Sequence, residues 1–290
     1  MNTIQSRQRP RIWTVRGRNL FESRPFLLMG VVNITPDSFS DGGRFLDPLH
    51  AVRHGEALAA EGAHILDLGA ESSRPGSDPV PIEEEWSRLA PVLIELRRRL
   101  PDLPLSVDTT KAELARRALD AGADIINDIS AGRMDEAMLP LAAERQIPTV
   151  LMHMRGTPKT MQDDPHYDDV AAEVAAELKE RARAAQALGL PRDRIVLDPG
   201  IGFGKRVEDN LALVERLEVL AELGYPVLVG ASRKSAIGKI TGAGVDDRLP
   251  GTLAFHIAAF LHGASIFRVH DAAPHLQALQ VIAALRGSTT

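Results

Sequence analysis

Cysteine is absent from the 290 residues of the sequence. This absence excludes disulfides, a thiolate nucleophile and cysteine-based zinc or iron–sulfur sites, so any metal must be held by oxygen or nitrogen ligands. An excess of positive charge is also lacking, because 34 lysine and arginine residues face 39 aspartate and glutamate residues, for a formal net charge of −5 at pH 7. General nucleic-acid-binding proteins carry a basic surface, so we expect no nucleic-acid partner, although a local anion site is compatible with this charge.

Long apolar runs are lacking too. The apolar stretches are short and interrupted, so none is long enough to cross a membrane as a helix. Residues 1–18 are basic and polar and lack the apolar region of a secretory signal, which predicts a cytoplasmic protein. With 44% apolar and 25% charged residues, the composition is that of an ordinary globular protein. The length suffices for one α/β barrel, which commonly needs about 250 residues.

Eight short apolar runs have the length of strands. They are residues 27–32, 65–68, 105–107, 125–126, 149–152, 195–197, 227–229 and 266–269. Between them lie segments with helical spacing of apolar residues, among them 112–119, 136–143, 170–188, 210–223, 253–261 and 276–285. The runs are apolar at consecutive positions, which is typical of parallel strands covered on both faces. Eight such repeats predict a single-domain (β/α)8 TIM barrel, with a doubly wound sheet as the alternative.

The predicted barrel has short additions at both ends. We place it at residues 25–286, after an N-terminal extension at residues 1–24 and before a tail at residues 287–290. Residues 11–15 are interpreted as a strand of a short hairpin that closes the bottom of the barrel. No linker divides the sequence into two domains.

Polar side chains follow all eight predicted strands. They are Asn33, Asp67, Asp108, Asn127, Asp128, His153, Asp198, residues 232–234, Arg268 and His270. In a barrel these positions share the C-terminal face, where active sites are built. Aspartate and asparagine also end strands because they suit turns and helix caps, which explains any one of them more easily than all together.

Two predicted loops at this face, residues 35–47 and 70–81, are longer than usual, which indicates lids or binding loops, or else solvated insertions. A third segment, residues 198–205, carries three closely spaced glycines. Glycines of this kind can bring backbone amides to a phosphate, but the spacing matches neither the Walker nor the Rossmann pattern. The alternative is a tight turn beside a ligand.

Three side chains near the last strands could carry chemistry. Lys234 could form a Schiff base as in a barrel aldolase, although the many carboxylates nearby argue against that role. Arg268 and His270 lie two residues apart and therefore on the same side of a strand end, which suits the clamping of an oxyanion. A contact between the arginine and a carboxylate is the alternative.

Eight motifs, in chain order and at barrel spacing, together resemble dihydropteroate synthase. They are NITPDSFSDGG at 33–43, Asp67 followed by ESSRPG at 71–76, VDT at 107–109, NDI at 127–129, MHM at 152–154, DPGIGFGK at 198–205, SRKS at 232–235 and RVHD at 268–271. The resemblance implies a cytoplasmic folate-pathway transferase that joins 7,8-dihydropterin-6-ylmethyl diphosphate to 4-aminobenzoate and releases diphosphate with the help of Mg²⁺. It also implies a sulfonamide target and a homodimer formed through the last helices.

The resemblance further assigns residues to each part of the site. The implied pterin-binding residues are Asp108, Asn127, Met152, Asp198 and Lys234. The implied diphosphate-binding residues are Asn33, Ser73, Arg74, Arg268 and His270, with Asn33 also a ligand of Mg²⁺. The implied aminobenzoate pocket consists of Phe39, Pro75, Phe203 and Ser235. The implied catalytic residues are Asp41, Asp108, Lys234, Arg268 and His270, with Asp41 stabilising the cation that forms when diphosphate leaves.

The sequence departs from the family pattern at two positions. Ser73 stands where the family usually has threonine, and Gly69-Ala70 stands where two glycines are common. Serine keeps the hydroxyl, so the sequence still predicts an active enzyme. The alternatives are a catalytically silent paralogue that binds pterin and a pterin-dependent methyltransferase of the same barrel type.

Overall fold

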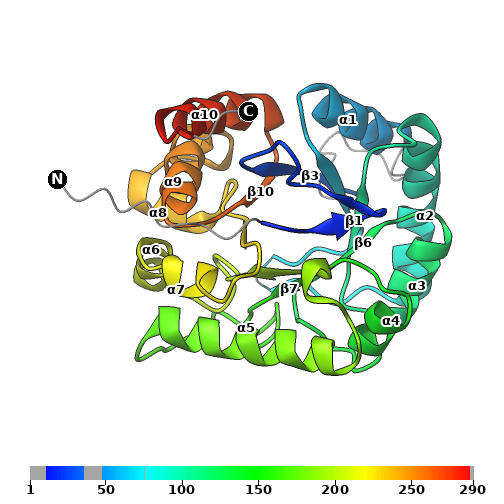
Figure 1. Ribbon diagram of the computed structural model, residues 1–290, viewed down its shortest axis with the longest axis horizontal. Coiled ribbons are helices and arrows are strands. Elements are labelled where there is room, and N and C mark those ends of the chain that lie inside the picture. Colours follow the sequence, from blue (N-terminus) through cyan, green and yellow to red (C-terminus); the bar gives the residue numbers. More distant parts are fainter. Residues whose placement is uncertain (1–10, 36–47, 75, 288–290) are drawn as a thin grey trace.

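Eight parallel strands form one sheet in the computed structural model, which describes residues 11–35, 48–74 and 76–287 (Figure 1). The strands are β3 (Leu27–Asn33), β4 (Ile65–Gly69), β5 (Leu105–Asp108), β6 (Ile125–Asp128), β7 (Thr149–Met152), β8 (Ile195–Asp198), β9 (Leu228–Val229) and β10 (Ile266–Val269). They pair in the order β8-β7-β6-β5-β4-β3-β10-β9, and a parallel bridge between Leu197 and Val227 joins the two ends of the sheet. The predicted (β/α)8 barrel is confirmed, and the doubly wound alternative is wrong.

Helices surround the strands as a ring (Figure 1). They are α1 (Pro48–Ala60), α2 (Ile82–Arg99), α3 (Ala112–Asp120), α4 (Met138–Glu144), α5 (Val170–Ala187), α6 (Val207–Glu215), α7 (Glu218–Ala221), α8 (Ser235–Thr241), α9 (Leu249–Leu261) and α10 (Ala272–Leu285). The predicted helix at residues 210–223 is divided into α6 and α7, because the chain turns at Arg216 and brings the buried Leu217 and Leu220 onto the core. Among the described residues, no helix is long and apolar enough to span a membrane.

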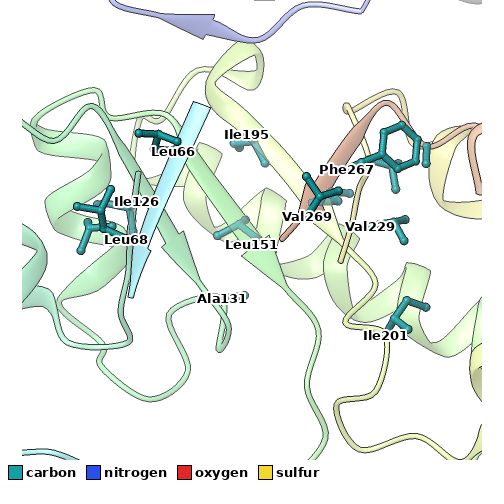
Figure 2. Close-up of a cluster of buried hydrophobic side chains, with 14 of the residues drawn as sticks. Leu66, Leu68, Ile126, Ala131, Leu151, Ile195, Ile201, Val229, Phe267 and Val269 are labelled. Carbon is teal, nitrogen blue, oxygen red and sulfur yellow. The ribbon is translucent and has the colours of Figure 1, made fainter. Parts of the chain in front are cut away.

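Successive residues of each strand face alternately toward the helices and toward the barrel interior. Leu66, Leu68, Ile126, Leu151 and Phe267 belong to the outward set, which Figure 2 shows among buried apolar side chains. They share one hydrophobic cluster with apolar side chains of the surrounding helices. This cluster attaches the helices to the sheet, and it explains why the strands are apolar at consecutive positions.

A second hydrophobic cluster fills the interior of the barrel near the amino ends of the strands, and the N-terminal hairpin covers it. We call it the lower interior cluster. The hairpin consists of β1 (Thr14–Val15) and β2 (Arg18–Asn19), which pair antiparallel, so the predicted hairpin is confirmed. Trp13 is fully buried beside it. It packs with inward-facing residues of seven strands, namely Leu27, Met29, Ile65, Ile125, Val150, Val196, Leu228 and Ile266. In Figure 1 the hairpin lies over the middle of the ring.

Replacement of Trp13 tests whether the N-terminal segment closes the bottom of the barrel. Trp13→Ala removes a fully buried aromatic side chain, so we expect the free energy of unfolding to fall by about 3–5 kcal/mol. Ile12→Ala is the matched control, because Ile12 is 45% exposed and its loss should change stability by about 0.5 kcal/mol or less. Equilibrium urea unfolding measures both. Equal effects of the two substitutions would contradict the assignment of Trp13 to the barrel core.

Candidate active site

The inner wall of the barrel changes from apolar to polar near the carboxyl ends of the strands. Asp67, Asn127, Asp198 and Arg268 each come two residues after an apolar member of the lower interior cluster. The two-residue period of a strand therefore places these four side chains on the same inner wall, one layer closer to the mouth. This register is why the polar strand ends converge.

A cleft opens at this mouth. Its lining residues are Ser73, Asp108, Asn127, Ile129, Met152, Asp198, Ile201, Phe203, Gly230, Lys234 and Arg268. Eight of them are site residues that the sequence predicts. A larger cavity adjoins the cleft on the side of the segment between β4 and α2, and it shares Ser73, Asp108 and Ile129 with the cleft.

Arg268 is held between two carboxylates. Its Nε lies 2.6 Å from Oδ2 of Asp67, and its Nη2 lies 2.8 Å from Oδ2 of Asp108. Asn127 Nδ2 donates to the same oxygen of Asp67 at 3.0 Å. Burial opposes the charge of Arg268, but the two carboxylates outweigh burial and raise its pKa, so it stays cationic. The carboxylate contact, which the sequence left as an alternative to an oxyanion clamp, is therefore present.

Asp108 and Asp198 are the acidic members of the cleft. Burial raises the pKa of Asp108, and the Arg268 guanidinium opposes that rise. Burial also raises the pKa of Asp198 to about 6, although its Oδ1 accepts the Gly200 amide at 2.7 Å. A buried carboxylate that titrates near neutrality is a group that a ligand with N–H donors can stabilise in its charged form.

Lys234 is the cation opposite them. Its Nζ lies 4.0 Å from the centroid of the Phe203 ring, a cation–π contact. Burial and the neighbouring Arg268 lower the pKa of Lys234 to about 8, while Asp198 favours its charged form. The cleft thus places hydrogen-bond donors and acceptors beside the Phe203 ring.

The glycines after β8 allow two backbone segments to touch. Gly200 has a φ of +68°, and a Cβ built on it would lie 1.9 Å from the carbonyl oxygen of His153. The amides of Gly200 and Gly202 already donate to the side chains of Asp198 and Asn210. The structure therefore supports the tight-turn interpretation of this segment over a phosphate loop, because these two amides already have partners.

Several predicted residues lie outside the cleft lining. Asn33 ends β3, and Ser235 is the exposed first residue of α8. Arg74 is exposed on the segment between β4 and α2. Phe39, Asp41 and Pro75 lie outside the described residues.

His270 also does not line the cleft, and burial determines the charge of its imidazole. Its Nδ1 lies 2.9 Å from Oγ of Ser232. Burial and Arg268 lower the pKa of His270 to about 3, so the imidazole is neutral at pH 7. In the predicted clamping of an oxyanion, His270 of the free protein would therefore act as a neutral hydrogen-bond donor.

Two polar residues at strand ends serve the scaffold. Asp128 accepts from the amides of Ser130 and Gly132, so its turn-forming role explains its position. His153 is fully buried behind the cleft.

Two anchoring contacts were not predicted from the sequence. Asp67 was noted only as a polar strand end, yet it is fully buried and holds both Arg268 and Asn127. Lys111 binds Glu71 at 2.7 Å and the fully buried Glu85 at 2.5 Å. Glu71 Oε1 in turn accepts the amide of Val80, so this network anchors the segment that carries Ser73. In the sequence, the one sign of these contacts is the position of Asp67 at a strand end.

Known proteins are similar to this chain in sequence and in fold. The family described as "Pterin binding enzyme" matches residues 29–270. The dihydropteroate synthase of Escherichia coli K12 is 43% identical over 269 residues, which cover 93% of this chain and 94% of that protein. The chain belongs to the dihydropteroate synthase family.

Two solved structures of dihydropteroate synthases extend the likeness to the fold. The Xanthomonas albilineans protein in complex with 7,8-dihydropteroate is 45% identical, with a TM-score of 0.82, over 91% of this chain and 95% of that one. The Yersinia pestis protein in complex with a sulfonamide drug is 38% identical, with a TM-score of 0.89, over 95% of this chain and 99% of that one. The family that the sequence motifs predict is confirmed.

Proposed function

We propose that the chain condenses 7,8-dihydropterin-6-ylmethyl diphosphate with 4-aminobenzoate to give 7,8-dihydropteroate and diphosphate. The observation that carries the proposal is the cleft at the barrel mouth, where Asp198, Asn127 and Lys234 meet beside Phe203, in a chain of the dihydropteroate synthase family. The related structures bind dihydropteroate and a sulfonamide drug, which supports the same substrates, and sulfonamide binding, for this chain.

The pterin ring fits the donors and acceptors of the cleft. One edge of the ring presents N–H donors beside a carbonyl, so Asp198 can accept two parallel N–H bonds. Asn127 and Lys234 are the partners for the remaining ring atoms. Met152, which is 4% exposed, supplies a soft apolar surface against the ring face, and Asp108 completes the pterin site.

The diphosphate is assigned to the adjacent strand ends. Arg268 supplies fixed positive charge, His270 and the Ser73 hydroxyl supply donors, and Arg74 reaches the anion from its exposed segment. An anion beside His270 favours the protonated imidazole, so diphosphate binding would raise the pKa of His270 above its value in the free protein.

Magnesium fits the oxygen donors at this end of the barrel. Asn33 offers an amide carbonyl oxygen, a ligand type that Mg²⁺ accepts. Within the described residues, no group of three or more histidine, aspartate or glutamate side chains is placed to hold a metal. The ion would therefore take most of its ligands from the substrate diphosphate and from water, and it would neutralise charge on the leaving group.

The chemical step breaks the bond between the pterin methylene carbon and the diphosphate oxygen. Negative charge grows on diphosphate and positive charge on the methylene, so cations at one end and carboxylates at the other lower the barrier. Arg268 serves the leaving group, Asp108 and Lys234 hold the ring, and Asp41 is assigned to the cation. The aminobenzoate nitrogen then forms the C–N bond and loses its proton. It needs no strong base, because an aniline is already unprotonated at pH 7.

The aminobenzoate pocket is assigned to Phe39, Pro75, Phe203 and Ser235. Phe203 lines the cleft, and Ser235 follows Lys234 directly. These residues come from four separate segments of the chain, so we propose that the pterin diphosphate binds first and that contacts to it complete the pocket.

The assembly and location of the chain follow the family expectation. We propose a cytoplasmic homodimer that uses the last helices. Leu261 on α9 and Val281 and Leu285 on α10 are 46%, 59% and 77% exposed, which supplies apolar surface for such a contact.

An assay of the purified protein tests the reaction. With pterin diphosphate, 4-aminobenzoate and Mg²⁺, we expect diphosphate release and dihydropteroate formation in equal amounts, each dependent on both substrates. Pterin binding without turnover would instead identify a silent paralogue. Methyl transfer from a methylated folate to a cobalamin acceptor would identify the methyltransferase alternative.

The pH dependence of pterin binding tests the assignment of Asp198. Since its pKa is about 6, protonation at lower pH turns one acceptor oxygen into a donor that faces a ring N–H. We expect the affinity for a pterin without diphosphate, measured by calorimetry, to be about tenfold lower at pH 5, one unit below the pKa, than at pH 7.

Asp198→Asn separates this effect from other titrations. The variant should bind weakly at both pH values and show no such fall, whereas the ligand titrates as it does with the parent protein. The same fall in the variant and in the parent protein would refute the role of Asp198.

A further inference from the structure

The segment that carries Phe203 into the cleft is held by side chains. Residues 199–206 connect β8 to α6 without regular secondary structure. Their backbone carbonyls accept from Gln162 Nε2 at residue 202 (2.9 Å), from Lys205 Nζ at residue 203 (3.0 Å) and from the Tyr167 hydroxyl at residue 204 (2.7 Å). Three consecutive carbonyls thus depend on side-chain donors, and Phe203 is in the centre.

Lys205 is the buried member of this set. It is 3% exposed, and it does not line the cleft. Its Nζ has a second partner, Nδ1 of His153, at 3.0 Å. With Lys205 as the donor, Nδ1 accepts and the proton of His153 sits on Nε2, which lies 3.4 Å from Glu177 Oε2. Burial lowers the pKa of His153 to about 4, in agreement with a neutral imidazole.

The two partners of Lys205 connect it to two parts of the cleft. His153 directly follows Met152 at the end of β7, and its amide donates to the carbonyl oxygen of Asp198 at 2.9 Å. On the other side, Lys205 holds the carbonyl of the residue whose ring lies against Lys234. The Lys205 amino group, whose pKa burial lowers to about 7, therefore connects the segment of Phe203 to the ends of β7 and β8.

We propose that Lys205 is a positioning residue for the second substrate, acting through Phe203. This inference rests on the proposed function, which assigns Phe203 to the aminobenzoate pocket. Without Lys205, the Phe203 carbonyl loses its donor inside the protein, so the segment shifts toward water and moves the ring away from Lys234. The pterin side depends less on Lys205, because Asp198 and Asn127 lie on strands and keep their own partners.

The direct test is a comparison of KM values for the two substrates. Lys205→Met keeps an unbranched apolar side chain, one atom shorter than lysine, and removes both hydrogen bonds. We expect the KM for 4-aminobenzoate to rise about tenfold, the effect of one buried hydrogen bond, with the KM for pterin diphosphate changed less than about threefold. Lys205→Gln keeps an N–H donor on a side chain as long as that of methionine, so we expect it to retain part of the interaction and to have an intermediate effect. Lys179→Met, an exposed lysine on α5, is the matched control.

Three outcomes would overturn the inference. They are an unchanged KM for aminobenzoate in Lys205→Met, a parallel rise of both KM values, and equal effects of the methionine and glutamine variants. Should the methionine variant not fold, the glutamine variant decides alone, by whether its aminobenzoate KM rises selectively. Calorimetry of 4-aminobenzoate in the presence of a pterin and diphosphate makes the same comparison without turnover, so a failure of the proposed reaction stays distinguishable from a failure of this inference.

Discussion

The ion pairs of Arg268 with Asp67 and Asp108 are the interaction on which the site depends. A buried charge is costly unless it is paired and hydrogen-bonded, and Asp67 is fully buried with its partners on two other strands. The network therefore fixes the relative positions of β4, β5, β6 and β10 at their carboxyl ends. It also orients Asn127, which the proposed function assigns to the pterin. Each of these buried polar groups would destabilise the protein if it were unpaired, whereas the hydrogen-bonded network holds the strand ends rigidly.

The barrel positions the strands that carry this network. Its lower interior is an apolar cluster sealed by Trp13 and the hairpin, and the same two-residue period that aligns this cluster aligns the polar layer above it. Segments without regular secondary structure carry further residues of the site. The Lys111 network anchors the segment with Ser73, and Lys205 anchors the segment with Phe203. Strand ends thus carry most of the pterin assignment, whereas Phe203 and Ser235 of the aminobenzoate assignment lie beyond the strands.

The barrel and the polar strand ends of the cleft could be predicted because both depend on local periodicity, whereas Ser73, Met152 and Phe203 were assigned only through the family resemblance. Apolar runs marked the strands, and the next polar residue marked the mouth. The anchoring contacts could not be predicted, because they join residues far apart in the chain: Arg268 and Asp67 are 201 positions apart, and Lys205 and His153 are 52 apart. The neutral state of His270 likewise follows from burial in the folded protein. The roles assigned to the site residues remain predictions, and Phe39, Asp41 and Pro75 lie outside the described residues.

The most direct test of this account is the affinity of a pterin without diphosphate for Asp67→Asn, Arg268→Gln and the double variant, measured by calorimetry. Asp67 does not line the cleft, so its effect on a bound pterin is indirect, through its hydrogen bonds to Arg268 and Asn127 and through its charge beside Asp108. We expect Asp67→Asn alone to weaken binding about tenfold or more and the double variant to lose much less than the two single losses combined. Unchanged affinity in Asp67→Asn, or additive losses, would contradict the central place of this network.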